Sequence, residues 1–309
     1  MNVFLCEPID QSAFLKLKEH FHVIDQYDQI HLSHCIITRN IQVNKELIDR
    51  CPLLKLIAVH GSGVDDVDID YAHSKNITVI NTPSLNSLSV AEMNIALMLE
   101  LSRKIYHVYH DKINNLYHEV ANPYYMGQEI SYKTVGFVGF GNIARLTSDI
   151  LKNGFHMNVQ AYDPYCSYQD VHLLSLEDLF KSSDYIIISC SLNDETYHLI
   201  NKDLLQLLKP TAYLINTSRG AIINEDDLYD CLINNHINGV GLDVIEGEPV
   251  EYNHRLLSLN NVIYTSHMGA STKEALHRVG QSLVNQIIDL LKDDFKLTIR
   301  LKINLFPLN

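Results

Sequence analysis

An arginine, a glutamate and a histidine each follow a strand-like run in the C-terminal half of the sequence. Arg219 comes after AYLINTS, Glu248 lies in GLDVIEGEP, and His267 comes after VIYTS. A guanidinium fork can hold a carboxylate and a carbonyl oxygen, and a protonated imidazole can donate to that oxygen. A carboxylate beside the imidazole favours its protonated form and orients the ring. Together these side chains could assist hydride transfer from a nicotinamide to a carbonyl that lies next to a carboxylate.

Each of the three residues alone has a simpler structural explanation. Arg219 could pair with a surface acid, Glu248 could be a solvated loop acid, and His267 could be a hydrogen-bonded loop histidine. Ligands of open parallel sheets bind at the carboxyl ends of the strands. Placement after consecutive strands therefore favours one shared active site.

The segment TVGFVGFGNIA, residues 134–144, predicts a turn that binds a dinucleotide. Residues 134–138 are apolar and predict a buried strand. Gly139 permits a tight turn, Gly141 lets a pyrophosphate approach the backbone, and the small Ala144 lets helix and strand pack closely. The N-terminus of the following helix would supply N–H groups and the positive end of its dipole to the phosphates.

Asp163 directly follows the next predicted strand, residues 158–162, and lies 22 residues beyond Gly141. An acid at this place is expected to bind the ribose hydroxyls of the adenosine. A carboxylate repels a 2′-phosphate, and no arginine directly follows Asp163. The sequence therefore predicts NAD rather than NADP as the cofactor.

Composition excludes several classes of function. The 309 residues carry a net charge of −13, with no basic cluster, which argues against a nucleic-acid or membrane partner. The N-terminus does not read as a signal peptide, and no apolar run reaches the length of a membrane span. The six cysteines are scattered, which predicts reduced thiols in the cytoplasm. The histidine pairs lack companions at the spacing of a structural site, so no metal is expected.

Strand-like and helix-like runs alternate in two regions, which predicts an α/β fold with parallel sheets. In the first region the expected strands are residues 3–6, 23–24, 35–38, 56–59 and 78–80, and the expected helices are 11–19, 45–50 and 68–73. In the second region six strands are expected at 134–138, 158–162, 185–190, 212–216, 239–244 and 262–265. Six is the full strand count of a dinucleotide-binding Rossmann domain.

Two capping boxes predict long helices. One runs from Ser89 to Glu92 and would open a helix of about 20 residues, through Ile105. The other, residues 271–274, would open a helix to about Leu291. Residues 114–131 read as a loop, and the tail after Phe295 reads as extended.

These residues resemble the D-isomer-specific 2-hydroxyacid dehydrogenase family, on its phosphoglycerate-dehydrogenase-like side. Six blocks occur in the family's order: HGSGVDDVD, NTPSLNSLSVAE, TVGFVGFGNIA, LKPTAYLINTSRGAIINEDDL, GLDVIEGEP and TSHMGAST. The resemblance implies a flavodoxin-like, discontinuous substrate-binding domain of residues 1–98 and 276–309. It also implies an NAD-binding Rossmann domain of residues 99–275, with a cleft between the two domains. The implied activity is NAD-dependent interconversion of a small 2-keto acid and its D-2-hydroxy acid.

The resemblance also assigns roles to positions. It implies that Arg219, Glu248 and His267 are catalytic, and that Ser62, Gly63 and Arg219 bind the substrate. The implied cofactor contacts lie in the glycine turn, at the adenosine acid and at the later strand ends: Gly139, Gly141, Asn142, Ile143, Asp163, Ser191, Thr217, Ser218, Asp243, His267, Gly269 and Val90.

The sequence departs from the family pattern at several positions. Ala144 replaces the third glycine, Ser191 and Ser266 replace prolines, and Asn193 replaces a threonine. Val59 lies where some phosphoglycerate-type members have an arginine, which argues against 3-phosphoglycerate as the substrate.

Two alternative functions stay open. One is an NAD(H)-sensing interaction protein like the family's corepressors, which the complete catalytic set argues against. The other is a formate- or phosphite-type dehydrogenase, although the formate type has a glutamine where Glu248 stands. The resemblance further implies a homodimer, with residues 105–126 as the contacting arm.

Overall fold

A computed structural model describes residues 1–116, 122–166, 168 and 171–303, with side chains described up to residue 292. The chain divides into two compact units. Unit 1 comprises Met1–Asn86 and Ser271–Asn309, and unit 2 comprises Ser87–Ala270. The predicted boundaries at 98/99 and 275/276 refer to functional domains and stay a prediction.

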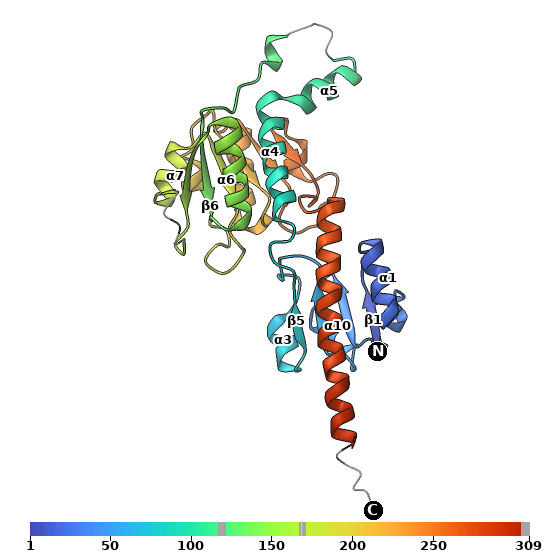
Figure 1. Ribbon diagram of the computed structural model, residues 1–309. Coiled ribbons are helices and arrows are strands. Elements are labelled where there is room, and N and C mark those ends of the chain that lie inside the picture. Colours follow the sequence, from blue (N-terminus) through green and yellow to red (C-terminus); the bar gives the residue numbers. More distant parts are fainter. Residues whose placement is uncertain (117–121, 167, 169–170, 304–309) are drawn as a thin grey trace, which may run out of the picture. The chain divides into compact units, whose positions relative to one another are not determined.

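Unit 1 is built on a parallel sheet with the order β2-β1-β3-β4-β5 (Figure 1). Its strands are β1 (Asn2–Leu5), β2 (His22–Ile24), β3 (Cys35–Thr38), β4 (Leu56–Val59) and β5 (Thr78–Ile80). Its helices are α1 (Gln11–His20), η1 (Tyr27–Leu32), α2 (Lys45–Asp49), α3 (Ile69–Ser74) and α10 (Lys273–Ile303). The order is that of a flavodoxin-like sheet, as the sequence predicts.

Helices cover both faces of this sheet. The central strands β3 and β4 are therefore buried along their whole length. On one face, Leu17 of α1 and Leu283 and Ile287 of α10 pack against Ile37. Figure 1 shows α10 alongside α1. On the other face, Leu47 of α2 belongs to a second buried cluster. The C-terminal segment therefore belongs to the core of unit 1.

Unit 2 is built on a second parallel sheet with the order β12-β11-β10-β9-β6-β7-β8. Its strands are β6 (Thr134–Val138), β7 (Asn158–Tyr162), β8 (His172–Leu173), β9 (Tyr185–Ile188), β10 (Tyr213–Asn216), β11 (Gly239–Leu242) and β12 (Val262–Tyr264). Its helices are α4 (Ser87–Arg103), α5 (Ile105–Ile113), η2 (Pro123–Tyr125), α6 (Asn142–Phe155), α7 (Leu176–Ser182), α8 (Lys202–Leu205), η3 (Gly220–Ile222), α9 (Glu225–Ile233) and η4 (Arg255–Ser258). The strand order reverses direction between β6 and β9, which is where a Rossmann sheet binds its dinucleotide.

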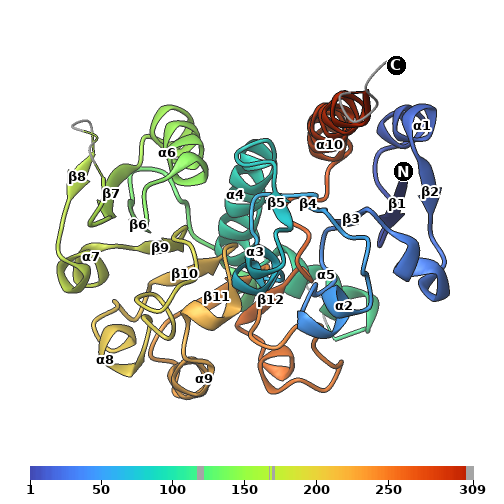
Figure 2. The ribbon, with the colours of Figure 1, turned by 90° about the horizontal axis from the view of Figure 1, so that it is seen from below.

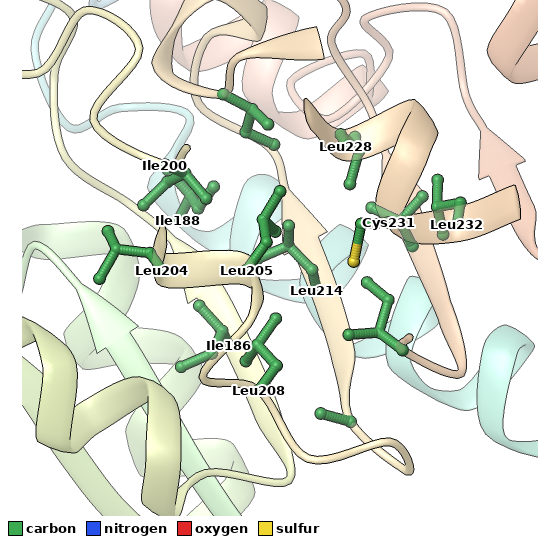
Figure 3. Close-up of a cluster of buried hydrophobic side chains, with 14 of the residues drawn as sticks. Ile186, Ile188, Ile200, Leu204, Leu205, Leu208, Leu214, Leu228, Cys231 and Leu232 are labelled. Atoms are coloured by element: carbon green, nitrogen blue, oxygen red, sulfur yellow. The ribbon is translucent and has the colours of Figure 1, made fainter. Parts of the chain in front are cut away.

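The second sheet also carries helices on both faces (Figure 2). α4 and α6 pack on one face through Leu97, Met98 and Leu151. α7, α8 and α9 pack on the other face, where Figure 3 shows Leu204, Leu205 and other side chains around the central strands. The α/β prediction with two parallel sheets is thus confirmed.

Three details of the sequence prediction are wrong. The first long helix begins at Ser87 rather than at Ser89, and both serines are buried, so tertiary packing overrides the capping box. The helix is interrupted at Lys104, whose φ of 53° is left-handed, before α5 begins. The sheet of unit 2 also contains β8, a two-residue strand that is too short to leave a periodic signal.

The predicted extended tail is also wrong. α10 continues as a helix to Ile303, well past Leu291 and Phe295. No glycine or proline interrupts the sequence between Gly280 and Pro307, so nothing local stops the helix. Its start is capped by Thr272, whose hydroxyl accepts a hydrogen bond from the Ala275 N–H at 3.1 Å, one residue later than the predicted cap.

Candidate active site

The glycine turn after β6 has the geometry that a dinucleotide requires. Gly139 has a φ of +87°, and a Cβ built there would lie 2.6 Å from the backbone nitrogen of Cys190. Only glycine fits this contact between the ends of β6 and β9. A Cβ built on Gly141, at the N-cap of α6, would meet nothing within 4 Å. Bare backbone and the N-terminus of a fourteen-residue helix are therefore open to a pyrophosphate.

Asp163 closes this turn from the end of β7. One carboxylate oxygen accepts from the Phe140 N–H at 2.8 Å, and the other accepts from the Tyr165 N–H at 2.8 Å. Each oxygen can accept one more hydrogen bond, since a carboxylate offers about four lone-pair positions. The half-buried carboxylate can thus hold ribose hydroxyls while it fixes the glycine turn.

A buried hydrogen-bond chain links the loop after β10 to the helices above it. The Thr217 hydroxyl donates to the Asn94 amide oxygen at 2.8 Å, and the Asn94 amide donates to the Thr147 hydroxyl at 3.3 Å. Asn94 and Thr147 are fully buried, so this chain fixes α4, α6 and the loop together. Asn94 is a residue that the sequence analysis missed. Its signal was a single amide among the apolar side chains of α4.

The Arg219 loop is held by its own neighbours and by the loop after β11. The Asn216 side chain accepts from the Ser218 N–H at 3.0 Å and donates to the Arg219 carbonyl at 2.9 Å. A Cβ built on Gly220 would lie 2.1 Å from the carbonyl carbon of Ile245. This close backbone approach places Arg219 beside the loop that carries Glu248.

Asp243 organises the loop that carries His267. Its side chain is buried and accepts from the Thr265 hydroxyl at 2.6 Å and from the Met268 and Gly269 N–H groups at 2.8 Å each. Its backbone carbonyl accepts from the His267 N–H at 2.6 Å. A Cβ on Gly269 would lie 2.7 Å from the carboxylate, which explains the glycine there. The predicted contact of Asp243 with a nicotinamide amide stays a prediction.

Glu248 and His267 form a hydrogen-bonded pair at the centre of the site. Glu248 Oε2 lies 2.7 Å from His267 Nδ1, and Glu248 Oε1 accepts from the Ile245 N–H at 2.9 Å. The carboxylate is 24% exposed and the imidazole 41% exposed. Pairing through Nδ1 directs Nε2 away from the carboxylate. The ring can therefore donate a proton to a bound molecule through Nε2.

Ser266 and His267 both have a left-handed backbone, with φ values of 50° and 55°. Two consecutive non-glycine residues in this region are strained, and such strain persists only where the surroundings impose it. Here the hydrogen bonds to Asp243 hold the residues that flank the pair. Proline could not replace Ser266 in this conformation, because its ring fixes φ near −65°.

The remaining predicted positions lie in several different loops. In unit 1, the Ser62 hydroxyl donates to the Asn86 side chain at 3.0 Å, and the Ser62 carbonyl accepts from the Asn81 amide at 2.7 Å, which orders the loop that includes Gly63. In unit 2, Ser191 is exposed and its carbonyl accepts from the Thr196 hydroxyl at 2.7 Å. Val90 is buried in α4 and faces Gly269.

The described residues offer neither a metal cluster nor a membrane-spanning helix. Among the residues that the structure describes, no group of three His, Cys, Asp or Glu side chains could hold a metal ion. Within the same part of the chain, no helix is long and apolar enough to cross a membrane.

Comparison with known proteins adds independent findings. Residues 95–269 match the family model for the D-isomer specific 2-hydroxyacid dehydrogenase NAD binding domain. The hydroxypyruvate reductase of Thermotoga maritima is 34% identical over 301 residues, which cover 92% of this chain and 96% of that protein. The D-lactate dehydrogenase of Aquifex aeolicus, solved with NAD and lactic acid, superimposes with a TM-score of 0.83 at 25% identity, over 96% of this chain and 97% of that one. The NAD-dependent formate dehydrogenase of Staphylococcus aureus, solved with NAD, gives a TM-score of 0.82 at 28% identity, over 96% of each chain.

Proposed function

Because this chain belongs to the D-isomer specific 2-hydroxyacid dehydrogenase family, we propose that it interconverts a small 2-keto acid and its D-2-hydroxy acid. The chain is an NAD-dependent oxidoreductase, and the small 2-keto acid is its proposed substrate. The observation that carries the proposal is the 2.7 Å pair of Glu248 and His267 at the carboxyl edge of the second sheet. A carboxylate-paired imidazole is the group that a 2-keto acid needs as its proton donor.

The residues of unit 2 fit NAD. When bound, NAD would accept or supply the hydride. The open backbone at Gly141 and the N-terminus of α6 would hold the pyrophosphate, with Asn142 and Ile143 in the first turn. Asp163 would bind the adenosine ribose and disfavour a 2′-phosphate. Ser191 follows β9 and is exposed, and Thr217 and Ser218 follow β10 and are half-buried. The family resemblance assigns cofactor contacts to all three residues.

Two side chains of unit 2, His267 and Arg219, would act on the substrate itself, and Glu248 would act through His267. His267 would hold a proton on Nε2 and transfer it to the carbonyl oxygen as the hydride arrives at the neighbouring carbon. Glu248 would orient the ring through Nδ1 and stabilise its positive charge. Arg219 would bind the substrate carboxylate through its guanidinium fork. In the reverse direction His267 takes up the hydroxyl proton.

The proposed substrate class is small and anionic. Arg219 supplies a fork that suits a carboxylate, and the family resemblance assigns the backbone of Ser62 and Gly63 to the same group. The reductase from Thermotoga maritima makes hydroxypyruvate the first compound to test on this chain. Val59 replaces the arginine of some phosphoglycerate-type members, so a phosphorylated substrate is less suited to this chain.

A substrate screen tests this function directly. NADH oxidation would be followed at 340 nm with hydroxypyruvate, glyoxylate, pyruvate, a branched 2-keto acid and phosphohydroxypyruvate. We expect turnover with at least one unphosphorylated 2-keto acid. Tight NADH binding without turnover of any of them would instead favour the NAD(H)-sensing function.

A formate-type activity is the second candidate, since the formate dehydrogenase of Staphylococcus aureus has the same fold. Glu248 argues against this activity, because the formate type has a glutamine at this position. Reduction of NAD with formate, measured in the same assay, distinguishes the two activities. Formation of NADH from formate alone would overturn the 2-keto acid proposal.

We also propose that the enzyme is a homodimer, with residues 105–126 as the contacting arm. Residues 117–121 of this arm lie outside the described residues. α5 buries none of its residues, and Ile105, Tyr109 and Ile113 are each more than half exposed. An exposed apolar helix of this kind is typical of an interface. Light scattering at micromolar concentration should give twice the mass of the 35.3 kDa chain, and a monomer would contradict the proposal.

A cytoplasmic location is proposed from the cysteines. All six are free thiols, and three of them, Cys35, Cys51 and Cys231, are buried. Burial raises the pKa of Cys190 and of Cys231 to about 11, so these thiols are unreactive at neutral pH. Free, unreactive thiols suit a reducing compartment.

A further inference from the structure

A second histidine–glutamate pair joins the loop that carries Glu248 to the segment after β9. His198 Nε2 lies 2.8 Å from Glu246 Oε2, and the Tyr197 hydroxyl donates to Glu246 Oε1 at 3.3 Å. The rings of Tyr197 and His198 are stacked, with centroids 4.0 Å apart. Both oxygens of Glu246 are therefore engaged by side chains from a single dipeptide.

The His198 segment is also tied to the residues that follow Arg219. The His198 N–H donates to the Ala221 carbonyl at 2.9 Å, and the Ile200 N–H donates to the Ile222 carbonyl at 3.0 Å. Ile200 pairs with Ile223 in a parallel bridge. The segment after β9 therefore contacts the loop after β10 through backbone and the loop after β11 through a side chain.

The loop that carries Glu248 turns at Gly247, directly after Glu246. Ile245 is buried and fixes the start of the loop. Gly247, next to Glu246, has a φ of +79°, and a Cβ built there would meet nothing within 4 Å. The backbone of Ile245 and Glu246 lies against Gly220, but packing does not restrain the tip of the turn at Gly247. Glu246 joins this turn to the neighbouring segment through its side-chain contacts with His198 and Tyr197.

On these contacts, and resting on the proposed roles of Glu248 and His267, we propose that His198 and Glu246 are positioning residues for Glu248. The pair holds the Glu246–Gly247 turn in the conformation that brings Glu248 Oε2 to His267 Nδ1. Neither residue touches the reacting atoms. The two side chains are 29% and 36% exposed, and a surface pair of this kind adds little to stability, so the effect of breaking it should appear in turnover rather than in unfolding.

Single substitutions test the pair. His198→Ala and Glu246→Ala should each lower kcat about tenfold, because a small displacement of an acid–base pair is costly to the chemical step. KM should change less than about twofold, since substrate and cofactor contacts remain. His198→Gln keeps an N–H donor for Glu246 and should recover most of the loss. Lys209→Ala removes a comparable pair with Asp184, at 2.9 Å, before β9, and should leave kcat unchanged.

A double variant separates loss of positioning from a general disturbance of the structure. In Glu248→Gln, the additional Glu246→Ala change should lower kcat less than about twofold, because the two act through one contact. An additive tenfold loss would overturn the proposal, and so would parental kcat in His198→Ala and Glu246→Ala.

A readout that does not depend on turnover keeps the proposal testable if the proposed function fails. The imidazole NMR signal of His267, assigned with His267→Ala, should move in Glu246→Ala in the same direction as in Glu248→Gln. An unmoved signal would contradict the positioning role. Absence of any 2-keto acid reduction by the parent protein would contradict the proposed function alone.

Discussion

Two histidines follow strands of the two parallel sheets, and their surroundings give them opposite properties. His60 comes directly after β4 in unit 1, is 4% exposed, and within the described residues its Nε2 has no hydrogen-bond partner. Burial, with a smaller contribution from Arg39, lowers the pKa of His60 to about 4. His267 follows β12 in unit 2, has a 41% exposed ring, and contacts Glu248 at 2.7 Å. One histidine is kept neutral by the core, while the other is accessible and paired with an acid.

This contrast shows that a place at a strand end does not make a histidine catalytic. The features that distinguish His267 are a carboxylate partner and a left-handed backbone. His267 has both, through Glu248 and through its left-handed φ. His60 is held in the core beside α10, where its Nε2 would lie 3.7 Å from a Cβ built on Gly280. Its environment stabilises the fold of unit 1 rather than a charged intermediate.

The largest expected effect follows from removing the accessible histidine. His267→Ala should lower kcat at least about 100-fold, since the proton donor is lost. The NADH dissociation constant should change little, because the proposed site for the phosphates is the turn after β6. Steady-state turnover with hydroxypyruvate and an NADH fluorescence titration measure the two quantities. The matched change at the other edge, His60→Phe, should leave kcat within about threefold. Comparable losses in both variants would remove the contrast.

The second prediction concerns the buried histidine and pH. The folded state keeps His60 neutral down to a pKa of about 4, whereas the unfolded chain takes up a proton near pH 6.5. Stability should therefore fall as the pH drops from 6.5 toward 4, by about 2 kcal/mol between pH 8 and pH 5. Urea unfolding at a series of pH values measures this loss. His60→Phe should be less sensitive to pH over that range, and identical pH slopes would show that His60 is not the responsible group.

The sequence predicts the buried strands of both sheets well, because buried parallel strands leave continuous apolar runs. The strands at 35–38, 56–59 and 134–138 agree with the structure residue for residue. The glycine turn was also readable, since Gly139 and Gly141 are required by backbone geometry. What was not readable depends on tertiary contacts. No local sequence pattern predicts three features: the left-handed backbone at Ser266, the hydrogen-bond chain of the buried Asn94, and the helix break at Lys104.

The third prediction concerns the glycine turn after β6, which lies at the same carboxyl edge of the second sheet as His267. Gly141→Ala adds a methyl group to open space, so the melting temperature should not change. The same methyl group would obstruct the pyrophosphate, and the NADH dissociation constant should rise about tenfold. Gly139→Ala is the matched variant, because its Cβ would clash with Cys190 at 2.6 Å and should also lower the melting temperature. Unchanged NADH affinity in Gly141→Ala would place the cofactor elsewhere.

The smallest expected effect tests the left-handed backbone at Ser266 and His267. Ser266 stands where the family has a proline, yet its φ of 50° is one that proline cannot adopt. Ser266→Pro should therefore displace His267 from Glu248 and lower kcat about fivefold. Ser266→Gly, which accepts a positive φ without strain, should stay within about twofold of the parent. Parental kcat in Ser266→Pro would mean that catalysis does not need this backbone, and that the carboxylate partner alone separates His267 from His60.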